Sequence, residues 1–490
     1  MTQLSVHSIT EFFRPKLDEF RQFFPRAATH RNFSTSVLAV TSSTMHHGVT
    51  DSARMVCDGT NQRNGDRIYE NILKSFKRVD NYNHQEIMRK LSEMIKDSGY
   101  LYKNKVNETE RSYIVIDGHN SIRSGRYMPG VKKTVQDSES PSKPQHTFAH
   151  MWGVAGVLVG NEELGISSLP VSGEIQQGEK EIRKWRGEGE YAMRSHVEKM
   201  ILKAGKLTEV YGASFVLGDA YFFTKNAVNE ILKHNAAHPD RLLTLISRAK
   251  KNAKAWEFPP DRQEGTLGRP RVRGDRVHLG ALFENEKKSF KKVSVNLYGE
   301  KEEVSYLEKI LLWGDDYTPV KFVLCSSSRG NIIFISTDTG VDAKTIIEAY
   351  ALRWKCEVSF KIESQSTGAF DSHFWTKRMP RLNRYAKKTD PDPLTLVKEE
   401  DRELIWKTFR AYERYAAVGF IGQALLQLYA FELASQDYVS SMWLRTRRKK
   451  VLSIENLIND IHNAFLLGFA ELGEELKPHK KKKDSSAIVK

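Results

Sequence analysis

Three acidic residues that lie far apart in the chain could together bind divalent cations. Asp117 ends the apolar run YIVID, Asp219 ends the run SFVLGD, and Glu357 lies in the segment YALRWKCEVSFK. Carboxylates at the ends of adjacent strands, with a third on a helix that crosses the sheet, can converge on one point. Such charges repel one another unless cations neutralise them. Oxygen donors suit Mg²⁺ or Mn²⁺, and two ions about 3.5–4 Å apart can hold the attacking and leaving oxygens of a phosphodiester.

Each aspartate also has a purely structural explanation, which the sequence leaves open. Asp117-Gly118 is a common turn pair, and Asp219 could cap a helix that begins at Ala220. For either residue in isolation we favour the structural explanation. The catalytic interpretation depends on both aspartates meeting Glu357.

The segment around Glu357 predicts a helix with two different faces. Asp342 is the expected N-cap, and the helix should run from Ala343 to about Ser364. At about 100° per residue, a polar stripe spans an arc of roughly 80° and consists of Tyr350, Arg353, Glu357, Lys361 and Ser364. A neighbouring apolar stripe, expected to pack on the core, consists of Ile347, Ala351, Trp354, Val358 and Ile362.

The polar stripe has two interpretations. Alone, it is best explained as a solvated face with ion pairs such as Glu357–Lys361. Beside two aspartates, the same stripe could face a nucleic-acid backbone. Arg353 would then bind phosphate through two parallel hydrogen bonds, and Lys361 would bind it as a point charge.

The elements that must position these residues follow from periodicity and turn signals. Up to about Glu110 the pattern predicts helices, including one with Asn83 as N-cap and Gly99 as stop. Strands are then expected at 113–117, 151–160, 166–175, 213–219 and 242–249, with helices at about 177–204 and 220–233. This order predicts an α/β fold, a mixed sheet with helices on its faces.

The segment 250–337 has alternating and apolar runs between Gly and Asn turns, which predict a β-rich insertion. The expected division of the chain is therefore a helical region at 1–109, a sheet domain at 110–249 and 338–435 that the insertion interrupts, and a helical region with a basic tail at 436–490. Basic runs at 250–254, 269–276 and 445–450 could hold phosphates, although such runs are solvated surface by default.

Composition narrows the class of protein. The net charge of +15 over 490 residues suits a polyanionic partner, or simply a basic soluble protein. Three cysteines are too few for a disulfide framework and favour a reducing cytoplasm. The N-terminus lacks the apolar core of a signal peptide. The most apolar segment, 415–434, is interrupted by Gln423, Gln427 and Glu432, which favours a buried helix over a membrane span.

The block IIEAYALRWKCEVSFK resembles the Y-x2-R-x3-E-x6-K signature of bacterial insertion-sequence transposases of the DDE type. Tyr350, Arg353 and Glu357 match it, as do Trp354 and the Phe360-Lys361 pair. YIVIDGHN and FVLGDAYF resemble the segments that carry the two catalytic aspartates, and ISRAKKNAKAW followed by GRPRVRGDR resembles the stretch after the second. The likeness covers roughly residues 35 to 435.

Two positions depart from the family pattern. Ser364 stands where the signature has its lysine, and His119 stands where relatives often have a small hydroxyl residue. Lys361, one turn earlier, could take the phosphate contact or correspond to a different family lysine. Whether this copy is active stays open.

The resemblance implies a ribonuclease H-like fold and a chemistry. Asp117, Asp219 and Glu357 would be the catalytic residues and would bind two Mg²⁺ ions, with Mn²⁺ possible. The expected DNA contacts are Tyr350, Arg353, Lys361, Arg269, Arg271 and Arg273. The protein would act as a prokaryotic, nucleoid-associated homodimer on terminal inverted repeats and target DNA, in some relatives through a hairpin with a flipped base on an aromatic residue. Trp313 and Trp256 are the residues to consider for that role, with core packing favoured for Trp313.

Two alternatives remain. One is a nuclease on the same fold that cuts DNA without joining it. The other is a catalytically inactive, transposase-derived DNA-binding protein.

Overall fold

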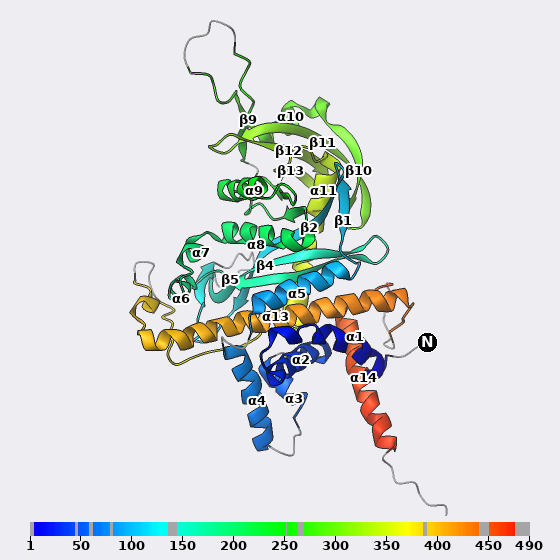
Figure 1. Cartoon of the computed structure of the whole chain (residues 1–490). Helices are drawn as coiled ribbons and strands as arrows, with labels where there is room; N and C mark the ends of the chain where they lie inside the picture. The colour runs from blue at the N-terminus through cyan, green and yellow to red at the C-terminus, as the bar shows by residue number, and fades with distance from the viewer. Residues whose placement is uncertain are drawn as a thin grey trace, which may run out of the picture.

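The computed structural model describes residues 4–44, 48–57, 62–78, 82–135, 145–250, 252–262, 269–385, 390–440 and 450–475. Side chains are described for these residues except Gln62 and those of 467–475. Lys251, most of the basic run at 445–450 and the basic tail at 480–483 lie outside the described residues. Figure 1 shows α13 running across the molecule between the N-terminal helices and a large sheet.

The N-terminal region is helical, as predicted. Its helices are α1 (Val6–Asp18), α2 (Ala27–Ser42), α3 (Val49–Arg54), α4 (Gln62–Lys77) and α5 (His84–Asp97). The predicted cap is confirmed, because the Asn83 side chain accepts a hydrogen bond from the Gln85 N–H. Gly99 follows α5 with a φ of +78°, a backbone conformation that favours glycine.

Behind these helices, the described strands form one mixed sheet. They are β1 (Lys103–Val106), β2 (Thr109–Ile122), β3 (Lys132–Val135), β4 (His146–Asn161), β5 (Gly165–Ile175), β6 (Ser214–Leu217), β7 (Leu243–Arg248), β8 (Lys254–Trp256), β9 (Arg276–His278), β10 (Lys291–Leu297), β11 (Glu300–Trp313), β12 (Thr318–Ser327) and β13 (Gly330–Ser336). The α/β prediction is confirmed at this level: a large mixed sheet with helices packed on it.

Strand order places the functional residues. The sheet runs β4–β2–β6–β7–β13–β12–β11, and β5 pairs with β4. β2 is antiparallel to β4 but parallel to β6, which is parallel to β7. The β-rich segment 250–337 continues this sheet, because β13 pairs with β7.

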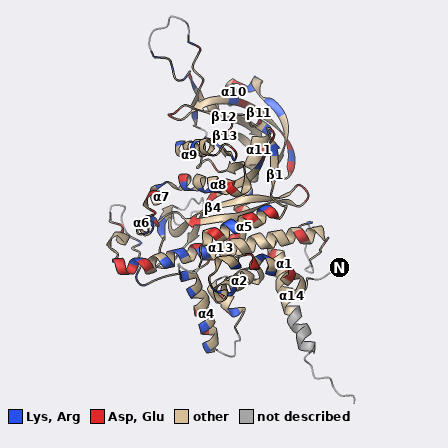
Figure 2. Ribbon diagram, viewed as in Figure 1, with Lys and Arg blue, Asp and Glu red and all other residues tan. Residues whose placement is uncertain are grey.

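Helices cover the sheet, and acidic and basic residues are interspersed over the helices and the sheet (Figure 2). α8 (His196–Tyr211) and α9 (Lys225–Ala237) pack on the central strands, and α13 (Glu399–Ser435) packs on β5. In Figure 1, α8 and α13 lie on opposite sides of β4 and β5. α13 is long and apolar enough to cross a membrane, but 94% of its apolar window is buried inside the protein. That burial agrees with the predicted core helix. α14 (Ile454–Glu475) packs beside it.

Two predicted helices have different bounds. The helix expected at 177–204 is divided into α6 (Lys180–Lys184), α7 (Gly189–Met193) and α8, because Gly187 adopts a φ of +75° and Ser195 starts a new capping box. The helix expected at Ala220 begins at Lys225 instead, with Thr224 as its N-cap. Asp219 therefore does not cap it.

The helix expected from Ala343 to Ser364 is two helices. Asp342 caps α11 (Ala343–Leu352) as predicted, but the helix breaks at Arg353 and α12 (Trp354–Gln365) follows. Beyond this break the predicted apolar stripe is wrong at Trp354, which is 50% exposed, and at Val358, which is 43% exposed, whereas Ile362 is partly buried against the core. The buried face of α12 instead consists of Cys356, Ser359, Phe360 and Glu363.

Candidate active site

Asp117 lies inside a strand and not at its end, contrary to the prediction. β2 runs on to Ile122 and keeps its pairing with β4, where Asp117 stands opposite Val154. The parallel ladder with β6 stops earlier, at the pair Val115–Leu217. Asp117 therefore stands where β2 has lost one neighbouring strand, and its side chain is 23% exposed.

Asp219 occupies the matching position after β6. Because Val115 pairs with Leu217, Asp117 and Asp219 each lie two residues beyond the last pair of the ladder. Asp219 Oδ1 accepts a hydrogen bond from the Tyr221 N–H at 2.9 Å, and its carbonyl accepts from Ser247 Oγ at 2.7 Å. The residue thus sits in a turn that a side-chain hydrogen bond stabilises.

Arg353 joins the first aspartate to the glutamate. Its Nη1 donates to Asp117 Oδ2 at 3.2 Å, and its Nη2 donates to Glu357 Oε1 at 2.6 Å. The break between α11 and α12 falls at Arg353, and Glu357 lies in the first turn of α12. One guanidinium therefore holds two of the three predicted acids.

The third acid belongs to the same electrostatic group. Burial, together with the negative charges of Asp219 and Glu357, raises the pKa of Asp117 to about 6. The Gly118 N–H and the Arg353 charge oppose this increase. The pKa of Arg353 is itself raised: burial disfavours its charge, but the hydrogen bond to Glu357 and the charges of its neighbours outweigh that cost.

The other residues of the polar stripe have different environments before and after the helix break. Tyr350 is buried, with its ring 5.1 Å from that of Phe334, and burial raises the pKa of its phenol. Lys361 is exposed one turn beyond Glu357, at the rim of a cavity of about 760 Å³ beside α12. The Ser364 hydroxyl is buried and lacks a hydrogen-bond partner.

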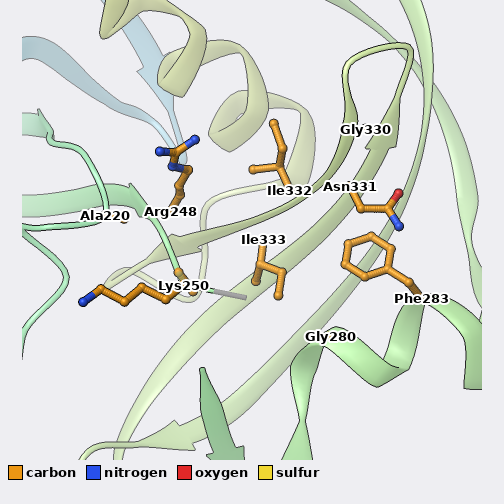
Figure 3. A pocket seen from close by; sticks show the side chains of 10 residues that line it. Ala220, Arg248, Lys250, Gly280, Phe283, Gly330, Asn331, Ile332 and Ile333 are labelled. Carbon is orange, nitrogen blue, oxygen red and sulfur yellow. The ribbon is translucent and has the colours of Figure 1, made fainter. Parts of the chain in front are cut away.

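A second cavity, of about 780 Å³, is lined in part by Ala220, the residue after Asp219. Ile332 and Ile333 of β13 and the ring of Phe283 line it, and Arg248 and Lys250 add two positive side chains (Figure 3). An apolar surface with cationic side chains beside a carboxylate can receive part of a nucleic-acid strand.

The predicted basic contacts are exposed but differ from one another. Arg269, Arg271 and Arg273 are all exposed. The Arg273 guanidinium lies 4.8 Å from the Trp256 ring centre and 5.2 Å from that of Tyr317, which commits it to a cation–π contact. Trp313 stacks on Phe223 with ring centres 4.0 Å apart, in agreement with the favoured packing role.

The oxygen ligands of the three acids suit a hard divalent cation in donor chemistry and in the sign of their charge. Within the described ranges, however, no three His, Cys, Asp or Glu side chains gather closely enough to hold a metal ion. Arg353 stands between Asp117 and Glu357 and supplies the positive charge there. Binding of such ions by these carboxylates would require Arg353 to release Asp117 and Glu357.

Sequence patterns missed two neighbours of the acids. Arg248 ends β7, and its charge affects the pKa of Tyr350. His196 begins α8, and its Nε2 would lie 3.4 Å from a Cβ placed on Gly118. The Ser195–Glu198 capping box that places His196 was visible in the sequence, but it lay within the long helix expected at 177–204. His119, the other departure from the family pattern, stacks on Phe370 at 4.6 Å.

No protein-family model matches this sequence, and no curated protein matches it significantly. Support for a function therefore comes from the residues and their geometry.

Proposed function

We propose that the protein is a DNA transposase that cleaves transposon ends and transfers the freed strands into target DNA. Asp117, Asp219 and Glu357 are its catalytic acids. The observation that carries this proposal is the grouping of the acids around Arg353, which donates to Asp117 and Glu357 while the Asp219 charge acts on Asp117. Arg353 holds one carboxylate from a strand and one from a helix, and the Asp219 charge raises the pKa of Asp117. Such electrostatic costs concentrate at functional sites.

The strand order supports the ribonuclease H-like form of the fold. β5, β4 and β2 are antiparallel neighbours, and β6 and β7 then follow in parallel beyond β2. α8 precedes β6, and α9 connects β6 to β7. On this interpretation the segment 250–337 is the family's β-rich insertion, joined to the core through β13.

The acids would hold two Mg²⁺ or Mn²⁺ ions, which supply activation of the attacking oxygen and stabilisation of the leaving 3′ oxygen. The protein itself contributes position and charge. Arg353 exchanges its carboxylate partners for a backbone phosphate, which accepts the same paired hydrogen bonds. Lys361 contacts the strand one turn further along α12.

DNA beyond the cleaved bond would follow the basic side chains. Arg248 and Lys250 line the cavity beside Asp219. Arg269 and Arg271 are exposed and hold flanking phosphates. We assign the partners as terminal inverted repeats and target DNA, the working state as a homodimer on paired ends, and the location as a prokaryotic cytoplasm.

The test uses the DNA that flanks the gene, which should contain inverted repeats bounded by short duplications. Purified protein, paired end duplexes made from those repeats, Mg²⁺ and a target plasmid should yield cleaved ends joined to the plasmid. D117N, D219N and E357Q should each lower joining by about 10³-fold or more while retaining DNA binding.

E363Q is the matched control. Glu363 lies on the same helix as Glu357 but is fully buried on a different face, about 120° away. Burial raises its pKa to about 8, so it is mostly protonated at neutral pH. This variant should join ends at the wild-type rate. Nicking without joining would identify a ribonuclease H-like nuclease instead. DNA binding without cleavage or joining by the wild type, with equal binding by D117N, would identify a non-catalytic DNA-binding protein.

A further inference from the structure

His196 approaches the aspartates from the opposite side of the sheet to Arg353. It is the first residue of α8, directly after the capping residue Ser195. Its ring lies 6.0 Å from that of Tyr221 and 5.6 Å from that of Phe222, both in the turn after Asp219. Its Nε2 faces Gly118, the residue after Asp117. The imidazole thus stands between the residues that follow the two aspartates.

Side chains from both faces of the sheet come close together at this point. Successive side chains of a strand point to opposite faces, so Asp117 is directed to α12 and position 118 to α8. β6 has ended before this register, and Gly118 has no side chain. A strand of DNA bound at this edge would meet Arg353 and Glu357 on one side and His196 on the other.

The hydrogen bonds of His196 define what it can bind. Its Nδ1 is hydrogen-bonded to Gln176 Oε1. Gln176 is 5% exposed, its backbone N–H donates to the Met151 carbonyl, and its side-chain NH₂ faces Met200 Sδ at 3.2 Å. An amide oxygen only accepts, so Nδ1 carries the proton and Nε2 presents a lone pair. Within the described part of the chain, no hydrogen bond to Nε2 is formed.

The imidazole is neutral at physiological pH. Burial, together with the nearby Lys199 charge, lowers the pKa of His196 to about 4. A neutral Nε2 acceptor cannot bind a phosphate oxygen, which is also an acceptor. It needs a hydroxyl or amino donor, and the donors at a phosphodiester bond under attack are the water molecule and later the DNA 3′-hydroxyl.

We propose that His196 is a further catalytic residue, whose Nε2 accepts a hydrogen bond from the attacking hydroxyl group and orients it toward the scissile phosphate. This inference rests on the proposed function and concerns the same site. The competing explanation is a structural one, in which the ring packs on Tyr221 and Phe222 and needs only its bond to Gln176.

Two variants separate these explanations. H196Q places an acceptor near the position of Nε2, whereas H196N keeps a donor near the position of Nδ1 that can still reach Gln176. With a pre-cut end duplex that carries a free 3′-hydroxyl, H196N should lower the single-turnover rate of joining by about 10²-fold, and H196Q by less than about tenfold. Duplex affinity should match the wild type in both variants. The melting temperature should match in H196N and be slightly lower in H196Q, which loses the hydrogen bond to Gln176.

The outcomes are distinguishable. If H196N joins as fast as the wild type, or H196Q is impaired as much as H196N, the role of His196 is disproved while the acid site stands. The role would also be contradicted if the two variants joined DNA at equal rates and only H196Q had a lower melting temperature. Joining by D117N in the same assay would instead refute the proposed function.

Discussion

Arg353 Nη1 lies 3.2 Å from Asp117 Oδ2, although 236 positions separate the two residues. The same guanidinium holds Glu357 Oε1. A single internal cation thus pairs with two of the three acids. Divalent ions would have to compete with it for the same carboxylates.

This competition predicts the effect of R353Q on metal affinity. Without the guanidinium, Asp117 and Glu357 lose their internal counter-ion, and we expect DNA-free R353Q to bind Mn²⁺ at least about fivefold more tightly, a difference of ~1 kcal/mol. Electron paramagnetic resonance titration at pH 7.5 measures this. R353K keeps a cation and should remain close to the wild type. Equal or weaker Mn²⁺ binding by R353Q would disprove the competition.

A second prediction concerns Asp117 and stability. Its pKa of about 6 exceeds the ordinary value of 3.8, so the folded state holds this proton more tightly than the unfolded state does. The free energy of unfolding therefore falls as pH rises from about 4 to 6, by up to ~3 kcal/mol from this group. D117N lacks the effect and should be more stable than the wild type at pH 7. Denaturant melts in EDTA at pH 4 and pH 7 test this; the gain must be larger at pH 7.

The protonation of Glu363 should change stability in the same direction as that of Asp117, over a wider pH range. Its Oε1 accepts from Ser359 Oγ at 2.7 Å, and its Oε2 has no hydrogen-bond partner. Its pKa of about 8, against an ordinary 4.5, means that folding retains its proton through neutral pH. Wild-type stability should decline between about pH 5 and 8, by ~5 kcal/mol at most, relative to E363Q. Parallel stability curves for the two proteins would contradict the protonated state of Glu363.

The exposed arginines predict a graded salt dependence. If Arg269 and Arg271 each neutralise one phosphate, then R269A and R271A should each reduce the slope of log affinity against log salt by about 0.9. Arg273 is held by Trp256 and Tyr317, so R273A should change this slope less. Fluorescence anisotropy at about 50 to 200 mM salt measures this slope for the three variants, because phosphate contacts weaken over this range. An unchanged slope in R269A and R271A would place the DNA elsewhere.

Local signals determined how much could be predicted. Asn83, Gly99 and Asp342 were recognisable because caps and stops act over a few residues. Asp117 and Asp219 were singled out because short apolar runs end at them, and Glu357 because of its place on the polar stripe. The break at Arg353 was missed because no turn residue marks the position, and Arg353 itself keeps right-handed helical φ and ψ angles. The exposure of Trp354 and Val358 was missed because helical periodicity alone does not show which face of α12 packs on the sheet.

The three acids also differ in how rigidly their backbone is supported. Asp117 belongs to the β2–β4 ladder, which continues past it to Ile122. Asp219 sits in a turn, and Glu357 stands just after a break between two helices. If the site contracts around its substrate, Asp219 and Glu357 should therefore move toward Asp117. The strand sets the reference point, and the turn and the helix provide the adjustment.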